Sequence, residues 1–159
     1  MIEPKFEMKE AFWVLGVEDE AYKIEEIDPG FNDLWMKRLM AKHDEVQPLS
    51  VDGAYYAVWS GTHGSDISDG NYLAGMAVRE GADVPDGWTL REVPAAIYAV
   101  FDSTLRDIGE ATEYALDHWL PESAYLYDGD KPRFDYMPPD TSGPETPVSV
   151  WIPVVRRKL

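Results

Sequence analysis

Residues 96–152 contain the clearest structural pattern of the sequence. This stretch contains AIYAVF at 96–101, DIGEATEYALDHWLP at 107–121, FDY at 134–136 and VSVWI at 148–152. The three short pieces are rich in aromatic and β-branched residues and are bounded by Gly, Pro and Asp, which is typical of strands. The longer piece has its apolar residues on one helical face and its charges on the other, which predicts an amphipathic helix.

The predicted helix has recognisable ends. Asp107 followed by Glu110 resembles a capping box, and Pro121 is expected to stop the helix. Its apolar stripe is formed by Ile108, Thr112, Ala115 and Trp119. We expect this stripe, including its Trp, to pack on a sheet.

The first half of the chain repeats this order of elements. FWVLGV at 12–17 predicts a strand, and Asp28-Pro29 begins a helix that runs through Leu39. GAYYAVW at 53–59 and YLAGMAV at 72–78 predict two further strands. We therefore predict an α+β fold, built as a tandem pseudo-repeat of strand-helix-strand-strand units over about 10–80 and 92–157. Each antiparallel sheet carries one helix, the two units leave a central cleft, and together they form one domain over residues 1–159.

Composition narrows the function classes. The 159 residues include 30 acidic and 14 basic ones, which gives a formal net charge of −16. Such a surface repels phosphate backbones and anionic membranes, and the sole basic cluster is Arg156, Arg157 and Lys158. No cysteine is present, so disulfide and thiolate chemistry are excluded. No apolar run reaches the roughly 20 residues of a membrane span. We expect a cytoplasmic protein.

Several short motifs, in this order, resemble a known family. They are NYLAGMAV at 71–78, VPAAIYAVF at 93–101, HWLPES at 118–123, FDY at 134–136 and VWIPV at 150–154. The series looks like the gyrase-inhibitor-like effector-binding family, the ligand-sensing domain of many AraC-type and MerR-type regulators. The resemblance covers nearly the whole chain. The helix-turn-helix of the regulators has no counterpart here, so we expect a stand-alone member without a DNA-binding domain.

The resemblance implies a pocket in the central cleft that takes amphipathic compounds, often cations. The family commonly has Glu in a Phe-Glu-x-Tyr-like motif, and this position is Asp135 here. A buried carboxylate beside aromatic rings is suited to an organic cation. The expected ligand-binding residues are Asp135, Tyr56, Tyr72, Tyr98, Phe101, Trp151 and Trp59, with Tyr55 as a further candidate. Because Tyr55 and Tyr56 alternate, just one of them faces the cleft.

Two other functions remain alternatives. Some stand-alone relatives are hydrolases of strained cyclopropane compounds, so hydrolysis of a small strained or activated compound is one of them. The other is an acidic protein-interaction module. The sequence shows no metal-ligand spacing around its three histidines and no nucleophile-elbow or phosphate-binding motif. We therefore predict binding without cofactor or metal, with small amphipathic cations and a separate regulatory protein as partners.

The charge balance leads to a first prediction. The protein should not bind duplex DNA at about 150 mM salt, because it lacks the clustered Lys and Arg that release counterions from phosphates. A mobility-shift titration measures this directly. A midpoint in the low micromolar range would contradict the prediction.

Overall fold

The computed structural model describes residues 3–21, 33–62 and 69–158. Their strands pair antiparallel, and those on the main path form one sheet in the order β1-β6-β9-β8-β3-β4-β2-β5, with β7 added beside β9. The α+β fold and its pseudo-repeat are as predicted, and the two predicted sheets are the two halves of this single sheet. The strands are β1 (Lys5–Lys9), β2 (Phe12–Glu20), β3 (Ser50–Ser60), β4 (Asn71–Val78), β5 (Thr89–Val93), β6 (Ala96–Thr104), β7 (Tyr125–Tyr127), β8 (Arg133–Met137) and β9 (Pro147–Arg156).

The sheet order shows an internal two-fold relation between the halves. The first repeat contributes the neighbouring strands β2-β4-β3 and the second contributes β6-β9-β8. In both, the first strand of the repeat lies farthest from the other half, and the second strand, β3 or β8, lies nearest to it. The innermost strands β3 and β8 pair with each other over Tyr55–Trp59 and Arg133–Met137. This pair is the seam between the halves.

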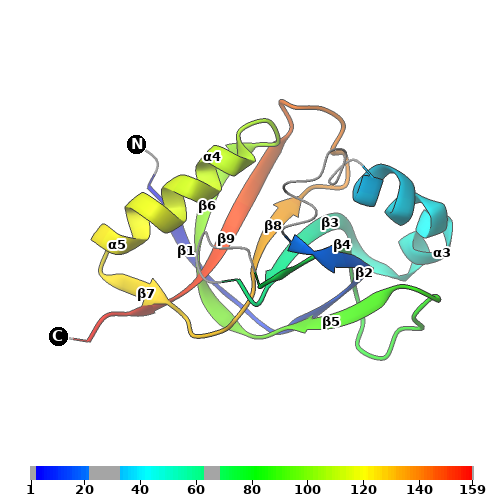
Figure 1. The fold of residues 1–159 in the computed structure, drawn as a ribbon, viewed down its shortest axis with the longest axis horizontal. Coiled ribbons are helices and arrows are strands. Elements are labelled where there is room, and N and C mark those ends of the chain that lie inside the picture. The colour runs from blue at the N-terminus through cyan, green and yellow to red at the C-terminus, as the bar shows by residue number, and fades with distance from the viewer. Residues whose placement is uncertain (1–2, 22–32, 63–68, 159) are drawn as a thin grey trace.

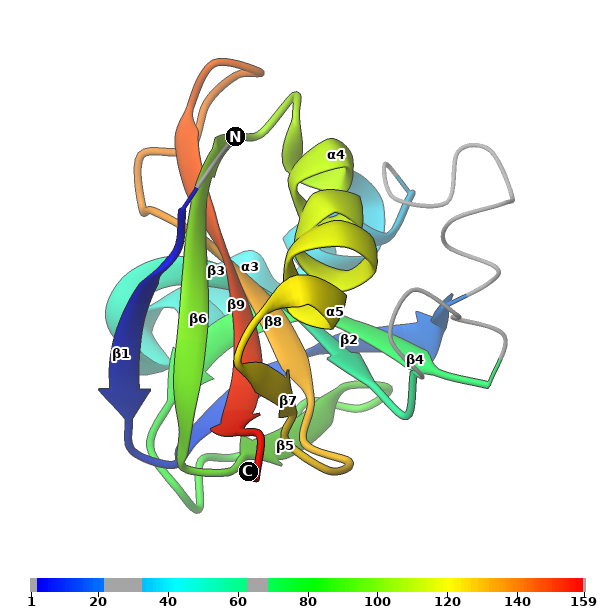
Figure 2. The ribbon, with the colours of Figure 1, turned by 90° about the vertical axis from the view of Figure 1, so that its left-hand side faces the viewer.

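Two strands outside the predicted repeat tie the halves together. β1 comes just before the first repeat but pairs with β6 of the second half, and β5 comes just before the second repeat but pairs with β2 of the first half. Figure 2 shows β1 running along the outer side of β6. Each half therefore completes its sheet with a strand from the other half.

Each half also supplies a helical segment, and the two lie over different parts of the sheet (Figure 1). The first consists of η1 (Asp33–Leu39), η2 (Met40–Lys42), α3 (His43–Val46) and η3 (Gln47–Leu49), and the second of α4 (Ile108–Glu113), η4 (Tyr114–Trp119) and α5 (Leu120–Glu122). Both η1 and η4 are π-helical, and they carry Trp35 and Trp119. No helix in the described ranges is long and apolar enough to cross a membrane.

The helix ends differ in part from expectation. The predicted start at Asp28-Pro29 lies outside the described residues. Asp107 is the N-cap residue of α4, but its side chain makes no capping hydrogen bond, so the capping-box prediction is wrong. Instead the Asp107 N–H is 3.4 Å from Thr104 Oγ1. Pro121 lies in the first turn of the short α5, a position where proline is tolerated. The helix ends just after it, at Glu122.

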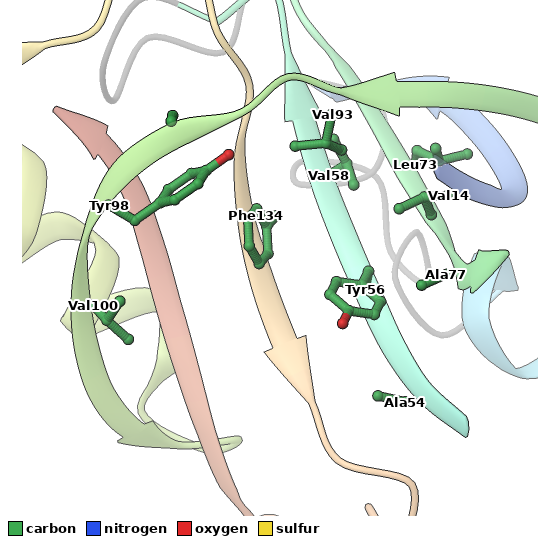
Figure 3. Close-up of a cluster of buried hydrophobic side chains, with 11 residues drawn as sticks. Val14, Ala54, Tyr56, Val58, Leu73, Ala77, Val93, Tyr98, Val100 and Phe134 are labelled. Carbon is green, nitrogen blue, oxygen red and sulfur yellow. The ribbon is translucent and has the colours of Figure 1, made fainter. Parts of the chain in front are cut away.

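The sheet is strongly curved, and its inner face encloses one apolar core. This core joins Val14 of β2 and Val93 of β5 to Tyr98 and Val100 of β6, although these strands stand toward opposite ends of the sheet. Figure 3 shows Tyr98, Phe134 and Tyr56 directed into this shared interior. The curvature thus brings β2 and β5 from one end of the sheet into contact with β6 from the other.

The outer face carries further clusters of buried residues under the two helical segments. Leu34 and Leu39 of η1 pack over β2, β3 and β4, while Ala111, Ala115 and Leu116 pack over β6 and β9. The seam where β3 pairs with β8 lies between the two helical segments. The fold thus leaves the seam as the floor of a gap between two helical walls.

Strands β2 and β4 approach each other unusually closely at one cross-strand pair. Gly16 is directly opposite Gly75, and a Cβ built on either glycine would overlap the carbonyl of Ala74 or Leu15 on the opposing strand. Because these neighbours are backbone atoms, they cannot rotate away as a side chain could. Glycine is required at both positions because the opposing backbone leaves no room for a Cβ atom.

This geometry predicts that Gly75→Ala lowers the free energy of unfolding by about 3 kcal/mol, since the strands must separate to admit the methyl group. The matched control is Gly109→Ala in α4, where an added Cβ meets nothing within 4 Å. That variant should be neutral or gain up to about 1 kcal/mol from helix propensity. Urea unfolding of the three proteins compares them, and equal stability of wild type and Gly75→Ala would refute the close approach.

Candidate ligand-binding site

A cavity of about 830 Å³ lies over the seam between the two halves. Its floor consists of three cross-strand pairs from β3 and β8: Tyr55 with Met137, Ala57 with Asp135, and Trp59 with Arg133. Side chains alternate along a strand, so these six residues share the outer face of the sheet while their neighbours face the inner core. The small side chain of Ala57 leaves room above its partner Asp135.

The walls come from opposite halves of the chain. Trp35, Met36 and Met40 line one side from η1 and η2. The other side consists of Leu105 and residues of α4, namely Ile108, Gly109, Thr112 and Glu113. Met36 is exposed, as is Met40 to a lesser degree. The cavity is therefore mostly apolar, and its methionine side chains are able to adapt to ligands of different shape.

Four aromatic side chains form a connected cluster in the cavity. Trp35 contacts Tyr55 and Tyr72 edge-to-face, with ring centres 6.3 and 6.5 Å apart, and Trp59 contacts Tyr72 at 4.7 Å. The polar groups of these side chains are hydrogen-bonded as well: Trp35 Nε1 donates to the Tyr72 hydroxyl at 2.8 Å. The Tyr55 hydroxyl is hydrogen-bonded to His43 Nε2, also at 2.8 Å. These bonds fix the rings in place before any ligand arrives.

Asp135 is a buried carboxyl group in the cavity floor. Its side chain is 6% exposed, and burial raises its pKa to about 6, while Arg133 and a hydrogen bond from Trp59 act in the opposite direction. The bond is from Trp59 Nε1 to Asp135 Oδ2, at 3.3 Å. The other oxygen, Oδ1, accepts a hydrogen bond from no residue in the described ranges. Asp135 is thus mainly ionised at neutral pH, in a site that only partly compensates its charge.

Arg133 places a positive charge in the same floor. It is 3% exposed, and its guanidinium carbon lies 4.6 Å from the centre of the Trp59 ring. This is the geometry of a cation–π contact. Trp59 therefore contacts Arg133 through its ring face and donates its indole N–H to Asp135, so the three side chains form one connected group.

The structure brings three of the seven sequence-predicted residues together in this cavity: Asp135, Trp59 and Tyr72. Tyr56, Tyr98 and Trp151 lie instead on the inner face, where Tyr56 and Tyr98 are core residues and Trp151 packs against that core. Phe101 is fully buried under α4 and η4. Strand alternation explains the inner-face positions, since residues one apart on a strand face opposite sides: Tyr56 follows Tyr55 on β3, and Tyr98 and Trp151 each have a neighbour in the outer core, Ala99 on β6 and Val150 on β9.

Other cavity residues were not among the predicted seven. Tyr55 faces the cavity and Tyr56 does not, which settles the choice that alternation had left open. Arg133 and Met137 could have been found from the same rule, because they flank Asp135 at two-residue spacing on one strand. Trp35 resembles a packing residue in sequence and does pack on its core, but it also lines the cavity. No periodic signal separates these two roles.

Comparison with known proteins identifies related folds. Residues 5–154 match a family model described as an integron-associated effector binding protein (Cass2). A transcription regulation protein from Staphylococcus aureus MU50 superposes with a TM-score of 0.68 at 11% identity, covering 97% of this chain and 99% of that one. SAV2435 bound to tetraphenylphosphonium superposes with a TM-score of 0.68 at 14% identity, covering 96% of this chain and 94% of that one. The EcmrR C-terminal domain superposes with a TM-score of 0.67 at 11% identity, covering 99% of each chain. No curated protein is significantly similar in sequence.

The raised pKa of Asp135 predicts a pH dependence of stability. The folded protein keeps this proton up to a pH of about 6, whereas the unfolded chain releases it near the ordinary aspartate value of about 4. Between these values the folded state binds more protons, so raising the pH lowers the free energy of unfolding, by about 3 kcal/mol in total. Urea unfolding at a series of pH values gives the free energy of unfolding of the wild type and of Asp135→Asn. The difference between the two at each pH isolates the contribution of the Asp135 carboxyl group. A difference that stays constant from about pH 4 to 7 would show that the carboxyl is not desolvated.

Proposed function

The chain belongs to the family of integron-associated effector binding proteins, and from this we propose that it binds amphipathic organic cations in the cavity between its halves. The observation that carries the proposal is a buried carboxylate, Asp135, in a floor and wall of aromatic rings. Aromatic faces attract a desolvated cation, and the carboxylate supplies its counter-charge. The binding of tetraphenylphosphonium by the similarly folded SAV2435 supports the same ligand class.

The cavity suits the apolar body of such a ligand as well as its charge. A volume of about 830 Å³ is within the usual range for drug-sized compounds. Tyr55, Tyr72 and Trp35 offer rigid apolar surface, while Met36 and Met40 offer surface that adapts. We therefore propose a binding site for several related compounds of one chemical class, as in multidrug-type ligand binding.

Charge at longer range favours the same ligands. The net charge of −16 gives the surface a negative potential, which raises the local concentration of cations. Arg133 opposes this effect inside the cavity, because it offsets part of the Asp135 charge. The contribution of Asp135 to cation affinity is for this reason expected at the low end of the range for buried charge pairs.

The setting proposed for this binding is the cytoplasm, in line with a sequence without cysteine. A separate regulatory protein is the proposed recipient of the ligand signal. A pull-down with and without a cationic ligand tests for such a partner.

The charge of Asp135 gives a prediction for binding. A diphenylpropyl trimethylammonium salt should bind more tightly than its neutral tert-butyl isostere, and Asp135→Asn should reduce cation affinity by about 2 kcal/mol while leaving the neutral compound nearly unchanged. Calorimetry on both ligands measures the loss. Asp102→Asn is the matched control, since Asp102 is exposed on β6 and does not line the cavity. An equal loss for both ligands in Asp135→Asn would exclude a counter-ion role.

The aromatic wall gives a second prediction. Trp35→Leu should weaken binding of the same cation by about 1–2 kcal/mol, because it removes one π-face and the hydrogen bond that orients Tyr72. The control is Trp119→Leu, at the π-helical Trp of the other half, which packs on Phe101 and Tyr125 away from the cavity. If both variants bind as wild type does, the cavity is not the binding site.

A further inference from the structure

The two walls of the cavity differ in charge. The lining residues of the first wall, Trp35, Met36 and Met40, are aromatic or apolar. The opposite wall carries a carboxylate, because Glu113 at the end of α4 also lines the cavity. A ligand with one charged end and one apolar end therefore meets different surfaces on the two sides.

Glu113 is accessible to a ligand. The residue is exposed, and its carboxylate makes no hydrogen bond or ion pair with any group in the part of the chain that the structure describes. The hydroxyl of its neighbour Thr112 donates instead to the Ile108 carbonyl, at 2.8 Å. Glu113 thus offers its full negative charge to a group that enters the cavity.

The floor attracts a cation less than its carboxylate alone would. Asp135 and Arg133 have opposite charges and lie two residues apart on the same face of β8, so their fields partly cancel at a ligand. Asp135 is also only 6% exposed, so it acts on a ligand mainly through space. Among the described residues that line the cavity, Glu113 is therefore the charge that no neighbour offsets.

Space for a head group is available beside Glu113. Gly109 lies one helical turn before it on the same face of α4 and also lines the cavity. A Cβ atom added at Gly109 would meet nothing within 4 Å. A ligand group that lies over Gly109 is therefore within reach of the Glu113 side chain and does not displace α4.

We propose that Glu113 is a specificity-determining residue, which contacts the cationic head group of the ligand at the α4 wall while the apolar body lies over the floor toward Trp35. The inference rests on the proposed function and adds the orientation of the ligand and the residue that contacts its charge. Asp135 contributes a second, buried charge from the floor. Because Glu113 is exposed, salt should screen its share of the affinity more than the share of a buried charge.

The test measures affinities by calorimetry on the full chain, with the diphenylpropyl trimethylammonium salt and its neutral tert-butyl isostere. Glu113→Gln should weaken binding of the cation about three- to fivefold, and Glu113→Lys by the same factor again, because the Coulomb energy is proportional to the charge at this position. The neutral isostere should bind all three proteins alike. Raising the salt concentration from about 50 to about 500 mM should reduce the difference between wild type and Glu113→Gln.

The matched control is Glu110, an exposed glutamate on the same helix that does not line the cavity. Glu110→Gln and Glu110→Lys change the net charge of the protein by the same amounts as the Glu113 variants, so they measure the effect of the general surface potential. Each should change cation affinity by less than about twofold. Thermal unfolding checks that all four variants are folded.

The outcomes separate this inference from the proposed function. If the cation does not bind wild-type protein, the proposed function fails and the inference with it. If it binds, but Glu113→Gln and Glu110→Gln behave alike, Glu113 does not contact the head group, while cation binding stands. An equal loss for the cation and its neutral isostere in Glu113→Gln also refutes the inference, because a change of shape and not of charge is then responsible.

Discussion

The pairing of β3 with β8 is the constraint on which the site depends. It joins the two halves at their innermost strands, and its register sets Ala57 opposite Asp135 and Trp59 opposite Arg133. A shift by one residue would turn every one of these side chains to the inner face. The helical walls then fall on either side of the seam, because each half covers its own strands. Cavity, carboxylate and aromatic floor are all consequences of one strand pair.

Much of this arrangement could be predicted from the sequence. The alternating and helical patterns located the main strands and the helix over 107–121, and the repeat order implied a cleft between related halves. The short strands β1, β5 and β7 were not predicted, since their residues are largely exposed or half-buried and give little apolar signal. Pairing partners are set by tertiary packing, which periodicity does not record.

The site was harder to predict for a related reason. Tyr56, Tyr98 and Trp151 have the same local patterns as Trp59 and Tyr72, and what separates them is which face of a curved sheet each one occupies. Both faces of the central strands β4 and β8 are buried, so the usual distinction between polar and apolar sides is missing there. Asp135 was found through its position in a motif. Arg133 was overlooked although it stands two residues before Asp135 on the same strand, and its positive charge lowers the pKa of the carboxyl group against the effect of burial.

The exchange of β1 and β5 between the halves has a consequence for how a ligand gets in. Each of these strands bridges from one half to the outer strand of the other, so the halves are fastened to each other at both ends of the sheet as well as at the seam. Opening them like a clamshell would break all three connections at once. A ligand therefore enters over a fixed floor, and the parts of the cavity that can yield to it are the walls, where Met36 and Met40 are exposed.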